Sequence, residues 1–171
     1  MSSELSSLWL RHTVATLAYR AEKALRDAPP GFAEFQVSPD TRAAIAIVGH
    51  MGDLMEWAER MARGEKRWEA VPPMSWAEAT DRFYRTVAAL DAAIAQGLPE
   101  GVRPEVLFQG PVADALTHVG QLMMMRRAAG APVRSENYAR ASISVGRVGR
   151  EQAAVRSEFD DDASASATPT T

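Results

Sequence analysis

Three features of the sequence predict an all-α protein, specifically a four-helix bundle. Four segments carry apolar residues every three or four positions, the period of an amphipathic helix. No alternating strand pattern occurs before residue 130. The connections at about 28–38, 65–74 and 98–104 are rich in Pro and Gly and long enough for a crossover. The helix order therefore need not be the simple up-down-up-down.

Helix breakers bound the first two helices. The first, at about 3–27, stops at the Pro-Pro-Gly sequence of residues 29–31. Its buried face is expected to contain Leu10, Val14, Leu17, Ala21 and Leu25. The second is expected to begin at Ser38 as N-cap, with Pro39 in the first helical position, and to end near Gly64. Its apolar stripe consists of Ile47, Val48, Met51, Met55, Ala58 and Met61.

A capping box, in which Ser75 precedes Glu78 by three residues, opens the third helix, and Gly97 ends it. The fourth contains the segment 111–129, which has no interior proline, and Gly130 closes it. Residues 1–150 are thus predicted to form one domain, in which 131–150 is an irregular strap with a weak strand signal at 143–145. Residues 151–171 hold five acidic residues and one arginine, followed by Ala, Ser and Thr, and are expected to be disordered.

Composition excludes several functions. The chain has 171 residues, 46% of them hydrophobic, and no cysteine, so it has no disulfide, iron-sulfur cluster or thiolate nucleophile. A net charge of -3 gives no reason to expect nucleic acid as a partner. No signal peptide is evident, and no stretch approaches the roughly 20 apolar residues of a membrane span. A cytoplasmic protein without a membrane partner is therefore expected.

A possible metal site stands out on the fourth helix. Asp114 and His118 are four residues apart, so their side chains share one helix face. His50, on the second helix, is the third ligand that the sequence offers, although a buried histidine of the core would fit the same pattern. Two imidazoles and one carboxylate would leave coordination positions open for water or substrate. Gln121 shares the face of His118 and is either a contact to a ligand or cofactor or a solvent-facing glutamine.

Two motifs are similar to those of the DinB/YfiT-like superfamily of metalloenzymes. One is Val48-Gly49-His50-Met51, and the more specific one runs from Gln109 through Asp114 and His118 to Gln121 and on to Pro132. The resemblance covers about 5–150. It implies an up-down-down-up bundle, frequently a homodimer, with a divalent metal held by His50, Asp114 and His118. The family commonly has histidine where this chain has Asp114, which favours a harder metal or, if Asp114 only orients a neighbour, a weaker site.

The resemblance, with the ligand set, favours a metal-dependent enzyme. A zinc, nickel, iron or manganese ion would activate water or a low-molecular-weight thiol, for hydrolysis or for thiol-dependent transfer or isomerisation of a small-molecule substrate. Without cysteine, the thiol would have to come from outside the chain. The alternative is a non-catalytic bundle with a degenerate metal site that binds a small molecule or self-associates. An open pocket with converging ligands would favour the enzyme, and a closed core with saturated hydrogen bonds the alternative.

One segment matches a known protease cleavage sequence. Residues 105–111, Glu-Val-Leu-Phe-Gln-Gly-Pro, resemble the cleavage sequence of picornaviral 3C proteases. Because this stretch lies inside the family-like motif and joins the fourth helix directly, it is interpreted as native chain and not as the remnant of a tag.

Overall fold

The computed structural model describes residues 3–154 and consists of four packed helical segments. Helix α1 spans Ser3–Leu25, α2 spans Ala44–Ala62 and α3 spans Trp76–Ala95. The fourth segment is composite, with α4 at Pro104–Leu107, the π-helical turn η1 at Phe108–Val112 and α5 at Ala113–Ala128. A short 3-10 turn, η2, follows at Tyr138–Arg140, and no strand occurs within 3–154. The predicted all-α four-helix fold is confirmed.

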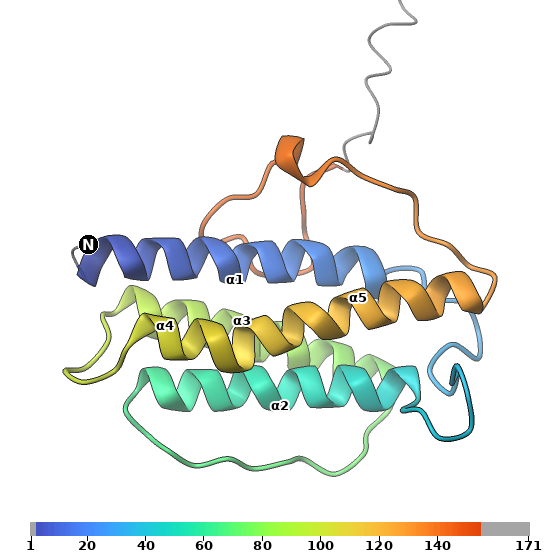
Figure 1. The fold of residues 1–171 in the computed structure, drawn as a ribbon, viewed down its shortest axis with the longest axis horizontal. Coiled ribbons are helices and arrows are strands. Elements are labelled where there is room, and N and C mark those ends of the chain that lie inside the picture. The colour runs from blue at the N-terminus through green and yellow to red at the C-terminus, as the bar shows by residue number, and fades with distance from the viewer. Residues whose placement is uncertain (1–2, 155–171) are drawn as a thin grey trace, which may run out of the picture.

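The ribbon in Figure 1 shows how the chain passes through the bundle. Its colours run from left to right along α1, from right to left along α2 and α3, and from left to right again along α4 and α5. The connection 63–75 makes this order possible, because it returns along the length of α2 before α3 begins. As a result, α2 and α3 run in the same direction and pack closely together.

The predicted start of the second helix was wrong. Ser38 does not cap α2, which begins at Ala44 after an N-cap residue, Ala43, that makes no side-chain capping bond. Instead, the Thr41 hydroxyl donates to the Ser38 carbonyl at 2.8 Å and accepts from the Ser38 amide at 3.1 Å. These local bonds close a turn, because Ser and Thr side chains offer the backbone an alternative to helical bonding. Residues 38–43 therefore form a loop at the end of the bundle.

The fourth helical segment contains a proline that interrupts its regular hydrogen bonding. It starts at Pro104, earlier than the segment 111–129 indicated, and continues through the buried Pro111. Proline has no amide hydrogen and its ring clashes with the preceding turn of an α-helix. The wider π turn at Phe108–Val112 accommodates the ring and lets α5 continue the helix. By contrast, the capping box at Ser75 and Glu78 is confirmed in full at the start of α3.

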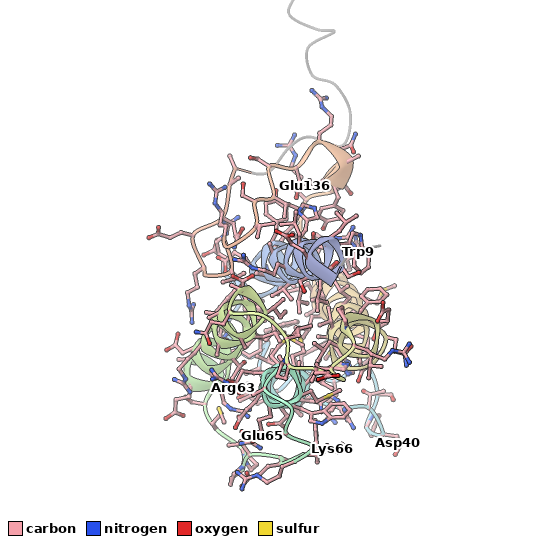
Figure 2. The ribbon with its side chains drawn as sticks, turned by 90° about the vertical axis from the view of Figure 1, so that its left-hand side faces the viewer. Trp9, Asp40, Arg63, Glu65, Lys66 and Glu136 are labelled. Atoms are coloured by element: carbon pink, nitrogen blue, oxygen red, sulfur yellow. The ribbon has the colours of Figure 1, made fainter. Side chains whose placement is uncertain are left out.

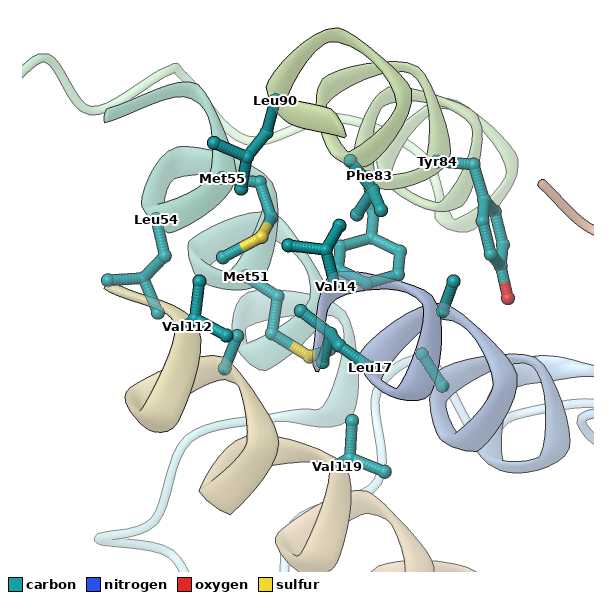
Figure 3. Packing of buried hydrophobic residues seen from close by; sticks show 14 of the residues in the cluster. Val14, Leu17, Met51, Leu54, Met55, Phe83, Tyr84, Leu90, Val112 and Val119 are labelled. Carbon is teal, nitrogen blue, oxygen red and sulfur yellow. The ribbon is translucent and has the colours of Figure 1, made fainter. Parts of the chain in front are cut away.

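The core lies along the bundle axis and takes side chains from every helix. Figure 3 shows Val14 and Leu17 from α1, Met51 and Met55 from α2, and Phe83 from α3 directed toward the same interior. All five are fully buried. Helix α2 also packs against α5, and this contact brings His50 close to Asp114 and His118.

The strap after α5 folds back over α1. Figure 2 shows Glu136 on the strap above α1, where its carboxylate accepts from Lys23 at 2.9 Å and from the Tyr19 hydroxyl. Residues 143–145 are irregular, so the weak strand signal there was misleading. Of the predicted tail, 151–154 is irregular and the rest lies outside the described residues. Within 3–154, none of the helices combines the length and the apolar character needed to span a bilayer.

Candidate metal centre

His50, Asp114 and His118 come together where α2 meets α5. Their three potential ligand atoms all lie within 4.8 Å of one another. The Asp114 carboxylate stands between the imidazoles, with Oδ2 at 3.7 Å from Nε2 of His50 and Oδ1 at 3.5 Å from Nε2 of His118. The two rings meet edge to face, with centroids 5.1 Å apart. The predicted set is therefore assembled as one cluster.

The separations within this cluster are too long for hydrogen bonds but suit donors that share an ion. Hydrogen bonds from imidazole nitrogen to oxygen are normally 2.7–3.2 Å long, roughly half an ångström shorter than these contacts. Two donors on a tetrahedral ion with bonds of about 2.0–2.2 Å lie about 3.3–3.6 Å apart. The contacts of 3.7 Å from Oδ2 of Asp114 to His50 and 3.5 Å from its Oδ1 to His118 are each close to that range, and one ligand atom from each residue can be chosen within 4.8 Å of the others. The donor types and their grouping are compatible with a divalent metal.

Burial and charge keep His50 in the form that a metal needs. The His50 pKa is lowered from its ordinary value, first by burial and then by electrostatic interaction with His118 and Arg42. A neutral imidazole has a lone pair on the nitrogen that carries no proton, and only this form ligates a metal. The His118 side chain is 10% exposed and that of Asp114 47%, so the cluster has a buried side and an open side.

Gln121 contacts His118, one of the three candidate ligands. Its Oε1 lies 3.0 Å from Nδ1 of His118, one turn earlier on α5. Because an amide oxygen only accepts, this bond places the imidazole proton on Nδ1 and leaves the lone pair of Nε2 toward Asp114. Gln121 therefore positions His118 in the manner of the outer partners of metal-bound histidines.

Two hollows flank the cluster, and their lining includes residues that sequence reasoning did not single out. One, of about 470 Å³, lies on the His118 side and is lined mainly by Val37, Thr41, Arg42, Ile47, Gln121 and Met125. The other, of about 350 Å³, lies on the His50 side and also includes Arg42. Trp68, in the connection after α2, stands edge-on to the His50 ring with centroids 6.0 Å apart. Arg42 and Trp68, which the sequence reasoning missed, are both in loops, where helical periodicity carries no information.

Asp53 and Glu56, the other acids near His50 in sequence, do not join the cluster. The Arg82 guanidinium on α3 donates to Asp53 at 2.7 Å and to Glu56 at 2.5 Å. Arg82 and Asp53 are both buried, so this is an ion pair inside the α2–α3 contact. The interface is close: a Cβ on Gly52 would lie 2.9 Å from the Arg82 guanidinium. These carboxylates are engaged by Arg82 in the α2–α3 contact, so His50 is the α2 residue that joins the candidate metal cluster.

No protein-family model, curated protein or solved structure matches this chain.

Proposed function

We propose that the protein is a divalent-metal-dependent enzyme of the DinB/YfiT-like kind. The observation that carries this proposal is the placement of the Asp114 carboxylate between two imidazoles, at distances that suit ion sharing better than hydrogen bonding. When bound, a zinc, nickel, iron or manganese ion would supply a nucleophile by lowering the pKa of a coordinated water or thiol. The expected reactions are hydrolysis or thiol-dependent transfer or isomerisation.

Each residue of the cluster has a distinct role in this proposal. His50 and His118 provide neutral nitrogen ligands, and Asp114 provides a negatively charged oxygen ligand. Gln121 holds the His118 ring and its tautomer through the 3.0 Å bond to Nδ1. Because the chain has no cysteine, any thiol must enter with the substrate or as a separate small molecule.

The larger hollow supports a small-molecule substrate with an apolar body and an acidic group. Val37, Ile47 and Met125 supply apolar contacts next to His118, whereas Thr41 and Gln121 supply hydrogen-bonding groups. Arg42 lies between the two hollows and presents a cation beside the metal ligands. The volume of the larger hollow, about 470 Å³, is in the usual range of about 300–1,000 Å³ for ligand pockets. An arginine at this edge would orient a carboxylate or phosphate of the substrate.

The non-catalytic alternative has less support. In a degenerate site, Asp114 and His118 would be saturated by hydrogen bonds within a closed core. Instead, Asp114 lies beyond hydrogen-bond distance of both histidines, its side chain is about half exposed, and a hollow opens beside His118. These features favour a site that receives a ligand.

Metal content is the direct test. The full-length protein is dialysed free of loosely held metal and analysed by inductively coupled plasma mass spectrometry beside His50→Ala, Asp114→Ala and His118→Ala. His12→Ala is the matched control, because His12 is an exposed histidine of α1 outside the cluster. The expected result is near-stoichiometric metal in the wild type and in His12→Ala, and its loss in the three cluster variants.

Activity screens follow from that result. Ester, amide and thiol-transfer substrates with an acidic group are assayed with the metal that the protein retains, and again after chelation and after metal is restored. Arg42→Gln is expected to raise KM for acidic substrates about tenfold, since it removes one charge-assisted contact. Wild-type protein that is metal-free and cannot be reconstituted would contradict the proposal and favour the non-catalytic bundle.

A further inference from the structure

A third hollow, separate from the two beside the candidate metal centre, lies on the opposite side of α5. It has a volume of about 340 Å³ and is lined by residues of α1, α5 and the strap. The α5 positions that line it, residues 116, 119, 120, 123 and 127, lie half a helical turn away from Asp114 and His118. The two sites therefore use opposite faces of one helix, and no residue lines both.

The lining of this hollow is strongly basic. Four cationic side chains, Arg20, Lys23, Arg127 and Arg134, surround one carboxylate, Glu136. The lining thus carries a net charge of +3, in a chain whose net charge is -3. Concentrated positive charge in a concave site raises the local concentration of anions.

Part of this charge has a structural role. Lys23 donates to Glu136 at 2.9 Å, with side chains that are 4% and 0% exposed, and Tyr19 also donates to Glu136. This buried pair anchors the strap on α1 (Figure 2). This ion pair accounts for Lys23 and Glu136, and neither Arg20 nor Arg127 takes part in it.

Arg20 is held in place without using all of its donors. Its guanidinium lies 4.0 Å from the centre of the Tyr138 ring, which fixes its plane. Its Nε is buried and finds no hydrogen-bond acceptor among residues 3–154. A buried donor without a partner costs free energy, and a bound water or ion is one of the ways in which such a group is satisfied.

Gly120 lines the hollow at an exposed position of α5. A Cβ built on this glycine would meet no atom within 4 Å beyond its own stretch of helix. A larger side chain at this position would therefore project beside the basic side chains without a clash at its Cβ.

We propose that this hollow binds a small polyanion of the phosphate class, such as a pyrophosphate or a phosphate ester. Arg20 and Arg127 supply the charged donors, and Gly120 supplies the room. Guanidinium groups match phosphate oxygens in two-pronged geometry, and each phosphate group carries about -1.5 to -2 charges, which suits a net charge of +3 in a small volume. The site is independent of the metal centre.

Calorimetric titration with pyrophosphate tests the proposal. The full-length protein is first treated with chelator so that no metal contributes, and the ionic strength is kept constant. Wild type is compared with Arg127→Gln, which removes one cation, and with Gly120→Leu, which fills the hollow without changing charge. Arg85→Gln is the matched control, because Arg85 is an exposed helical arginine on α3, outside this hollow. His118→Ala checks that the metal centre is not involved, and thermal unfolding confirms that each variant is folded.

The expected result is one saturable site in the wild type. Binding should weaken about tenfold in Arg127→Gln, since a charge-assisted bond is lost, and at least as much in Gly120→Leu. Arg85→Gln and His118→Ala should stay within twofold of the wild type. Equal losses in Arg127→Gln and Arg85→Gln, or unchanged binding in Gly120→Leu, would overturn the site. Citrate that binds as tightly as pyrophosphate would overturn the assignment to the phosphate class.

Discussion

Replacement of Gln121 by leucine tests whether the side chain that contacts His118 matters for metal binding. The substitution removes the acceptor at 3.0 Å from Nδ1, so the ring loses the bond that fixes its tautomer and orientation. Loss of such an outer partner normally weakens metal binding by about 10–100-fold, or about 1.4–2.8 kcal/mol. Because Gln121 is exposed, water replaces part of the lost bond, and we expect the lower end, about tenfold.

The assay is competition for Zn²⁺ between the protein and a chelating dye at pH 7. Gln121→Glu is expected to keep wild-type affinity or exceed it, since the carboxylate retains an acceptor for Nδ1. Gln96→Leu, at an exposed glutamine that ends α3, serves as the matched control. The apo protein should keep its stability within about 0.5 kcal/mol, because the substitution is at the surface. A Gln121→Leu protein with wild-type zinc affinity would refute the positioning role.

Three further results are expected. Arg82→Leu should lower the free energy of unfolding in denaturant by about 3 kcal/mol or more, because it leaves the buried carboxylate of Asp53 without its partner. The His50 pKa is lowered in the folded protein, so the metal-free protein should lose stability as the pH falls below about 6.5, and His50→Gln should lose less over the same range. A picornaviral 3C protease should leave native protein uncut and cleave it only under denaturing conditions, because the Gln109–Gly110 bond lies in a helical turn bounded by the fully buried Leu107 and Val112. Fast cleavage of native protein would show that this turn opens readily.

The sequence predicted most reliably the features that depend on neighbouring residues. The capping box at Ser75 formed as expected, because its bonds join residues three positions apart. Asp114 and His118 share a helix face for the same kind of reason. The predicted start of α2 was wrong, because a hydrogen-bonded turn at Ser38 replaced the helical cap. The fourth helical segment extends before 111, because a π turn lets it continue through Pro111.

The candidate site could be predicted only in part. The sequence identified the three candidate ligands, whereas for Gln121 it left a solvent-facing side chain as the favoured interpretation, and only the structure shows its contact with His118. Arg42 was missed because it was expected inside the second helix, whereas the later start of α2 places it in a loop beside both hollows. Asp53 is buried, and its partner Arg82 lies on another helix, so neither its burial nor its ion pair could be read from the residues around it.

By itself, the sequence determined that the chain forms amphipathic helices, which side chains share a face of each helix, and that any metal must be held by His, Asp, Glu or water. These properties follow from helical periodicity and composition, which need no knowledge of the partner helix. Only the tertiary structure decided that His50 meets Asp114 at 3.7 Å, and that the opposite face of α5 adjoins a basic hollow. The packing of α2 and of the strap against other helices sets these distances, and such contacts between residues far apart in the chain leave no local signal.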